Sequence, residues 1–154
     1  MLNNSFKIED VIPILSEVIE SGGEFELYPR GTSMLPLIRE GKDSVILVSP
    51  DDPKIGDIVL YRRKCGQYVL HRIIGRESEF FTMCGDNQTK AERGIAREQI
   101  IAKVKLLKRD GITFDCASEK YRKWVKKWLN MTYRRVALLR YRAAKKLGLR
   151  GPDK

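Results

Sequence analysis

A serine in a turn-prone segment and the single histidine of the chain are the residues whose chemistry is most informative. Ser33 follows Pro29 and Gly31, which interrupt an alternating run, and Pro36 comes soon after it. This pattern predicts that the serine lies at the edge of a loop. A serine hydroxyl is a useful nucleophile only when a positioned base takes its proton. The sequence therefore indicates a pair formed by Ser33 and His71, suited to acyl transfer, without showing that the two meet in space.

Each of these residues also has an ordinary structural interpretation. A turn serine commonly hydrogen-bonds its own backbone. In the run 68–74, His71 shares a face with Val69 and Ile73, which is typical of a core histidine satisfied by one hydrogen bond. The functional alternative is a general base, because an apolar setting disfavours the imidazolium and keeps the ring neutral near pH 7.

An acidic side chain would complete such a pair by accepting from the second imidazole nitrogen, which fixes the tautomer and stabilises the cation that forms. Two candidates follow the histidine: Asp86 in a Gly-Asp-Asn segment and Glu92 in a Glu-Arg-Gly segment. The competing interpretation is an Asx turn followed by a solvated charge cluster. The residues alone leave this choice open.

The elements that must position these side chains are predicted to be short antiparallel strands. Apolar or alternating runs bounded by Gly, Pro and Asp predict strands over residues 24–28, 45–48, 58–61, 68–74, 80–83, 100–107 and 112–114. Before them, residues 1–23 contain a short helix, with Asp10 as its N-cap, Pro13 in its first turn and Gly22-Gly23 as its end. We therefore expect a mainly β body over residues 24–116.

The final segment, residues 117–154, changes both period and charge. Apolar residues recur every three or four positions from 118 to 147, which predicts a basic amphipathic helix. This tail holds 13 Lys/Arg and 2 Asp/Glu, whereas residues 1–116 hold 17 and 18. The composition is typical of a helix lying on an anionic membrane surface, with these residues as candidates: Trp124, Trp128, Lys126, Lys127, Arg134 and Arg135. The alternatives are a helix packed on the body with a solvated basic face and, with no recognised motif to support it, nucleic-acid binding.

Composition narrows the class of protein. A chain of 154 residues predicts one domain with a tail. Its three cysteines form no C-x-x-C pair, so we expect reduced thiols, no metal and no cofactor. We find no apolar run long enough to span a bilayer and no secretory signal, so the expected location is cytoplasmic, with the tail as a route to the inner face of the membrane.

Four segments in order carry a resemblance to a known family: residues 31–36 (GTSMLP), 54–59 (KIGDIV), 70–75 (LHRIIG) and 85–87 (GDN). Together they resemble the boxes of type I signal peptidases, whose clan includes the LexA-type self-cleaving proteases, over roughly residues 25–107. Bacterial signal peptidases have a lysine at the place of His71, and a histidine there resembles the endoplasmic-reticulum and archaeal type. The resemblance implies a signal peptidase/LexA-like β fold.

By that resemblance Ser33 is the nucleophile and His71 the general base. Glu92 stands where the histidine-type enzymes have an aspartate, and Asp86 is the other candidate for the acidic partner. The Ser33 N–H would help to stabilise the oxyanion, with Thr32 and Met34 as neighbouring substrate or oxyanion residues. Many bacterial relatives carry a hydroxyl two residues before the nucleophile, where this chain has glycine.

The resulting hypothesis is a serine endopeptidase that cleaves a leader-like or signal-like precursor peptide. The alternative is a catalytically inert module of the same fold that binds peptides or membranes. A LexA-like self-cleaving regulator is less favoured, because those proteins use lysine and cut before the nucleophile, whereas the Cys65-Gly66 dipeptide here follows Ser33.

Overall fold

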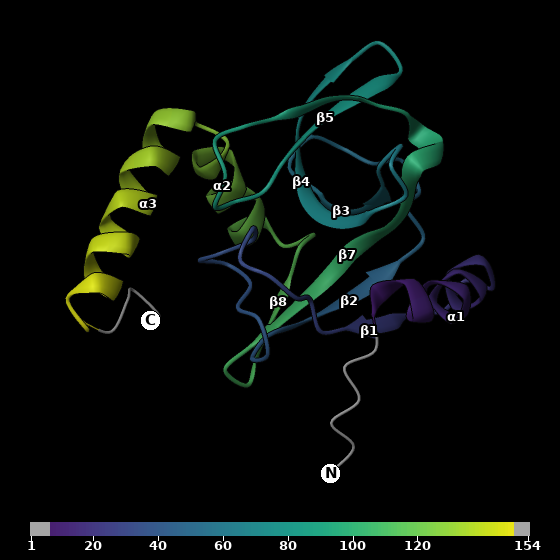
Figure 1. The fold of residues 1–154 in the computed structure, drawn as a ribbon, viewed down its shortest axis with the longest axis horizontal. Helices are drawn as coiled ribbons and strands as arrows, with labels where there is room; N and C mark the ends of the chain where they lie inside the picture. The colour runs from purple at the N-terminus through teal and green to yellow at the C-terminus, as the bar shows by residue number, and fades with distance from the viewer. Residues whose placement is uncertain (1–6, 150–154) are drawn as a thin grey trace.

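An eight-stranded antiparallel sheet forms the body of the protein in the computed structural model, which describes residues 7–149 (Figure 1). The spatial order is β1-β2-β7-β3-β4-β5-β6, with β8 paired to β7. In chain order the strands are β1 (Phe25–Leu27), β2 (Ser44–Val48), β3 (Ile58–Arg62), β4 (Tyr68–Glu77), β5 (Phe80–Cys84), β6 (Glu92–Ile95), β7 (Ile100–Arg109) and β8 (Ile112–Asp115). The helices are α1 (Ile8–Glu20), α2 (Glu119–Trp128) and α3 (Met131–Lys146), with a 3₁₀ turn at Arg97–Gln99. The prediction of a mainly β fold is confirmed.

Strand β3 separates the apolar interior into two clusters, because its alternate side chains point to opposite faces of the sheet. Ile58 and Leu60 belong to the first cluster, together with residues of α1, β2 and β7. Val59 and Tyr61 belong to the second, together with residues of β4, β5, β6 and β7. Burial on both faces explains why this strand is a continuous apolar run in the sequence.

The start of helix α1 differs from the prediction. The helix begins at Ile8 with Lys7 as its N-cap, so the assignment of Asp10 as N-cap is wrong and Pro13 lies beyond the first turn. Asp10 acts from the third helical position instead, where its carboxylate accepts a hydrogen bond of 3.2 Å from the Lys7 N–H. The predicted end is confirmed: Gly22 adopts φ +81°, a left-handed conformation that glycine reaches at little cost.

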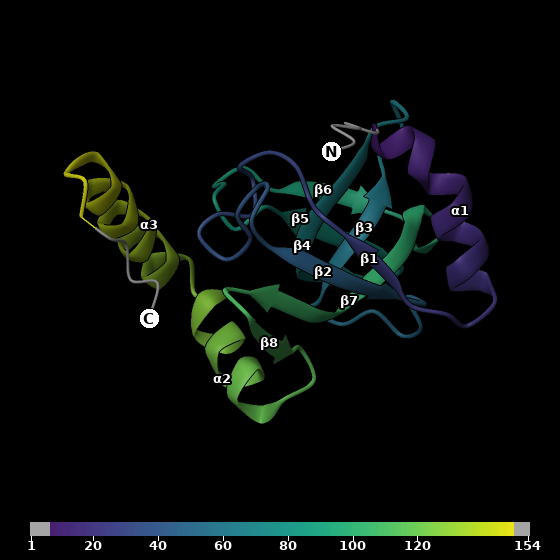
Figure 2. The ribbon, with the colours of Figure 1, turned by 90° about the horizontal axis from the view of Figure 1, so that it is seen from below.

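The C-terminal segment forms two helices, so the prediction of a single amphipathic helix is wrong. The Asn130 side chain accepts hydrogen bonds of 3.1 Å from the N–H groups of Thr132 and Tyr133, which starts α3 as a new helix. Helix α2 packs on the body through the buried side chains of Val125 and Trp128. Figure 2 shows that α3 then extends away from the sheet beyond α2.

Arg72 of β4 is fully buried and joins three separate parts of the chain. Its Nε and Nη2 donate to the two carboxylate oxygens of Asp86 at 2.8 and 2.7 Å. Its Nη1 donates to the Gly56 carbonyl at 2.8 Å and lies 3.4 Å from the Tyr121 hydroxyl of α2. The guanidinium carbon also lies 5.6 Å from the centroid of the Trp124 ring. Because a buried charge is tolerated only when its donors are satisfied, Arg72 holds the Gly56 turn, the Asp86 loop and α2 together.

Removing one member of this buried pair should therefore destabilise the whole fold. We expect Asp86→Asn to lower the free energy of unfolding by about 3 kcal/mol or more, because it leaves the Arg72 charge buried without its counterion. Urea unfolding followed by circular dichroism measures this loss. Glu119→Gln is the matched control, because it breaks the ion pair with Lys123 on the exposed side of α2. Equal effects of the two substitutions would contradict the assigned role of Arg72.

Candidate functional site

Ser33 and His71 line the same cavity, which has a volume of about 250 Å³. Ser33 comes from the Ser33 loop (residues 29–38) between β1 and β2, and His71 comes from the middle of β4. Apolar and polar residues complete the lining of this cavity: Pro29, Arg30, Gly31, Met34, Ile38, Arg63, Gln67, Tyr68, Val69, Leu70 and Gln88. The fold thus brings the two residues of the predicted pair to the wall of one cavity.

The Ser33 loop is fixed from the side by the 85–88 loop (residues 85–88). The Asn87 N–H donates to the Ser33 carbonyl at 2.8 Å, and the Asn87 side-chain amide donates to the Thr32 carbonyl at 3.1 Å. The loops touch so closely that a Cβ built on Gly85 would lie 2.6 Å from the Ser33 carbonyl oxygen. Within residues 7–149, the N–H groups of Ser33 and Met34 donate no hydrogen bond. These donors are therefore available to an oxyanion.

The two neighbours of the serine lie differently. Met34 is buried, lines the cavity and belongs to the first apolar cluster. Thr32 is exposed and does not line the cavity, so its hydroxyl is not placed beside the other candidate residues.

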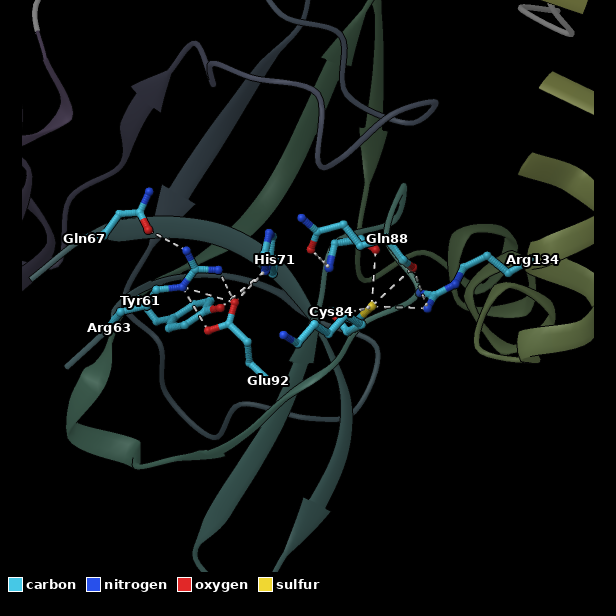
Figure 3. A network of polar contacts seen from close by, with 10 residues as sticks. Tyr61, Arg63, Gln67, His71, Cys84, Gln88, Glu92 and Arg134 are labelled. Atoms are coloured by element: carbon cyan, nitrogen blue, oxygen red, sulfur yellow. Dashed lines mark hydrogen bonds and ion pairs between the residues drawn. The ribbon is translucent and has the colours of Figure 1, made fainter. Parts of the chain in front are cut away.

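One edge of the His71 ring faces a polar cluster formed by Tyr61, Arg63 and Glu92 (Figure 3). The Nδ1 atom lies 3.3 Å from the Tyr61 hydroxyl and 3.8 Å from a Glu92 carboxylate oxygen. Arg63 donates from Nε to both Glu92 oxygens, at 3.1 and 2.9 Å, and its Nη2 forms a further ion pair with this carboxylate. Beside an ionised carboxylate, a proton on Nδ1 is favoured, which leaves the Nε2 lone pair free to act as a base.

The protonation of these groups follows from their surroundings. Burial lowers the pKa of His71 to about 4, against the opposing influence of the Glu92 charge. Hydrogen bonds from Arg63 hold the pKa of Glu92 below its usual value. At neutral pH the site therefore contains a neutral imidazole next to an ionised carboxylate, which is the state that a general base requires before it accepts a proton. Among the described residues, the Ser33 hydroxyl makes no hydrogen bond to His71, and such contacts are often long in unliganded sites.

The structure separates the two acidic candidates. Glu92 of β6 lies next to the imidazole, whereas both carboxylate oxygens of Asp86 accept hydrogen bonds from Arg72. Arg72 follows His71 in β4, so their side chains leave opposite faces of the sheet. Asp86 is therefore occupied in holding the 85–88 loop and is not in contact with the histidine.

The six residues predicted to contact a membrane do not form one exposed face. Trp128 and Arg134 are 3% and 1% exposed, so their assignment to the membrane surface is wrong in this structure. Trp124 stacks on Trp128 with ring centroids 5.1 Å apart and is partly buried. Figure 3 shows Arg134 reaching inward from α3, where Nη2 contacts the sulfur of Cys84 and the carbonyl of Gln88. Lys126, Lys127 and Arg135 are exposed.

Three residues that the sequence did not single out lie beside the pair: Tyr61, Arg63 and Gln88. The register of the β3–β4 hairpin pairs Val59 with His71, which places Tyr61 on the same face as the histidine. The alternation of side chains in this hairpin could therefore have predicted that Tyr61 lies beside His71. Arg63 and Gln88 lie in loops, whose approach to the cavity depends on tertiary packing and has no signature in a single sequence.

Comparison of the chain with protein-family models, with curated proteins and with solved structures gave no match. Over residues 7–149, no helix is both long and apolar enough to cross a membrane. In the same range, no group of three or more His, Cys, Asp or Glu side chains is placed to hold a metal ion.

A methyl group added at Gly85 should displace the Ser33 loop. Gly85→Ala places a Cβ against the Ser33 carbonyl oxygen, and the backbone must move to relieve the contact. We expect faster amide hydrogen exchange in residues 31–38, measured by mass spectrometry. Gly75→Ala is the matched control, because a Cβ there meets Thr82 at an ordinary 3.5 Å. Unchanged exchange in Gly85→Ala would show that the 85–88 loop does not fix the position of Ser33.

The single histidine allows its pKa to be measured directly. We expect the imidazole signals of His71 in proton NMR to titrate near pH 4, and those of the urea-unfolded chain near 6.5. Because the unfolded chain takes up this proton first, His71 should weaken the folded state as the pH falls from about 6.5 to about 4. Glu92→Gln should lower the midpoint further, since a negative charge beside the ring is removed. A midpoint above pH 6 in the folded protein would contradict this description of the site.

Proposed function

We propose that the protein is a serine endopeptidase in which Ser33 is the nucleophile and His71 is the general base. The observation that supports this proposal is the shared cavity, to which a loop serine and a neutral buried histidine both contribute. The proposal also draws on the resemblance of residues 31–36, 54–59, 70–75 and 85–87 to the boxes of type I signal peptidases.

The proposed reaction is an acyl transfer. The Ser33 hydroxyl oxygen attacks a peptide carbonyl carbon while its proton passes to Nε2 of His71. The carbonyl oxygen becomes an oxyanion that the free N–H groups of Ser33 and Met34 can stabilise. Collapse of this intermediate breaks the C–N bond, and the imidazolium gives its proton to the leaving amine. Water then releases the acyl group from Ser33 by the same two proton transfers.

Glu92 has a supporting role in this proposal. When His71 becomes positively charged, a carboxylate 3.8 Å from Nδ1 stabilises the imidazolium and favours the orientation in which Nε2 accepts the proton. Arg63 holds the carboxylate in the ionised form through its hydrogen bonds. The proposed substrate is a leader or precursor peptide, since a polypeptide is what such a pair cleaves in the family that the motifs resemble.

The second candidate is an inert binding module that has the same cavity and no turnover. It is favoured by the glycine at position 31, where many relatives have a hydroxyl, and by the absence of a direct Ser33–His71 hydrogen bond among the described residues. The two candidates differ in one measurable property, which is the reactivity of the Ser33 hydroxyl.

Active-site labelling tests this proposal. A fluorophosphonate probe, followed by intact mass spectrometry, should modify the wild-type protein once. We expect Ser33→Ala to abolish the modification and His71→Ala to slow it by at least about a hundredfold, the usual contribution of a general base. Because the pKa of His71 is about 4, the labelling rate should be level from pH 8 to 6 and should fall only below about pH 5.

Ser49→Ala is the matched control, because it removes another hydroxyl outside the cavity and should leave labelling unchanged. Circular dichroism confirms that each variant is folded. A folded wild-type protein that resists the probe over the whole pH range, or a Ser33→Ala variant that still reacts, would overturn the proposal. The first of these results would favour the inert binding module.

A further inference from the structure

The outer face of α3 carries an apolar stripe that no described part of the chain covers. Val136, Leu139 and Leu147 are 44%, 65% and 73% exposed, and Leu149, just beyond the helix, is 61% exposed. Positions 136, 139, 143 and 147 follow one another at intervals of three and four residues, so they lie on one side of a helix. Exposed aliphatic side chains in a contiguous row are a feature of binding surfaces.

The opposite face of α3 is already used for contacts with the body. Leu138 and Arg134 are 3% and 1% exposed, and Arg142 donates to the Asn87 carbonyl and side-chain oxygens at 3.2 and 3.0 Å. These contacts hold the helix by its inner side against the 85–88 loop. Figures 1 and 2 both show α3 at the periphery of the molecule, with its outer side away from the sheet. A simple rotation that buried the stripe would break the inner contacts.

The charge around the stripe is of one sign. Residues 131–146 contain six Lys and Arg and no Asp or Glu. By helical geometry Arg135 and Lys146 border the stripe on one side and Arg140 lies along the other. Long basic side chains beside an aliphatic row can place their charges at lipid headgroups while their stems remain on apolar surface.

We propose that this outer face of α3 docks on the surface of an anionic lipid bilayer. A bilayer offers both an apolar layer for Leu139 and Leu147 and negative headgroups for the flanking cations, so it complements both features at once. A nucleic-acid backbone would match the charge but would leave the leucines in water. Docking does not depend on the peptidase activity. The membrane contact is assigned to the aliphatic residues of α3, because the tryptophans of α2 are packed inward.

Vesicle co-sedimentation of the full chain tests this docking. We expect the wild-type protein to bind vesicles of phosphatidylglycerol and phosphatidylcholine at least about tenfold more tightly than vesicles of phosphatidylcholine alone. Raising the salt from about 0.05 to about 0.5 M should weaken binding, because the attraction between exposed charges is screened. The variant with Leu139→Gln and Leu147→Gln should bind the anionic vesicles at least about tenfold more weakly, since its apolar insertion is lost. Glutamine is a good helix former, so the helix should persist.

The matched control carries Ile14→Gln and Ile112→Gln, which remove side chains of similar exposure, 60% and 58%, from α1 and β8. This variant should bind as the wild type does. Ser33→Ala should also bind normally, so that failure of the peptidase and failure of docking remain distinguishable. The proposal is overturned if the wild type ignores anionic vesicles at low salt, or if the Leu139 and Leu147 variant binds like the control. Tighter binding to single-stranded RNA than to vesicles, unchanged in that variant, would replace it by nucleic-acid binding.

Discussion

The buried pair of Arg72 and Asp86 is the constraint on which the site depends. Both side chains are fully excluded from solvent, so the guanidinium can be accommodated only where acceptors surround it. This requirement fixes the 85–88 loop against β4. The Asn87 N–H in that loop donates a hydrogen bond to the Ser33 carbonyl. Because His71 precedes Arg72 in the same strand, anchoring one side chain on its face also fixes the other on the opposite face. A single electrostatic requirement thus positions the serine and the histidine together.

The two carboxylates near the pair show how environment divides roles between chemically similar groups. Both carboxylate oxygens of Asp86 accept hydrogen bonds from a buried cation, so Asp86 acts on the imidazole only through its charge and not through a contact. Glu92 shares its charge between Arg63 and His71, at the partly exposed edge of the cluster. Its distance of 3.8 Å from Nδ1 provides electrostatic support without a hydrogen bond in the resting site. A glutamate on β6 can therefore supply negative charge beside the imidazole, with an arginine to restrain its long side chain.

The sequence predicts the helices and strands whose signals are local. It does not predict the elements and residues whose position depends on tertiary contacts. Apolar runs located seven of the strands, because burial on at least one face leaves a clear pattern. Strand β6 was missed because Glu92–Ile95 has one apolar side chain and pairs only with β5, across an irregular register. The helical period continues through Asn130, so the periodicity alone does not mark the cap that starts α3. Ser33 and His71 were identifiable by residue type, whereas the selection of Glu92 over Asp86 required knowledge of where Arg72 lies.

The glycine at position 31 has a conformational explanation that bears on the choice between enzyme and inert module. Gly31 adopts φ +85°, and a Cβ placed there would meet no atom within 4 Å. A serine at this position would meet backbone strain rather than a lack of space, since left-handed φ costs other residues about 1–2 kcal/mol. A loop of this shape has no side-chain hydroxyl at position 31. The N–H groups of Ser33 and Met34 are the donors that remain for the oxyanion. The glycine thus suits the path of the loop, and this conformational requirement weakens it as evidence that the site has lost turnover.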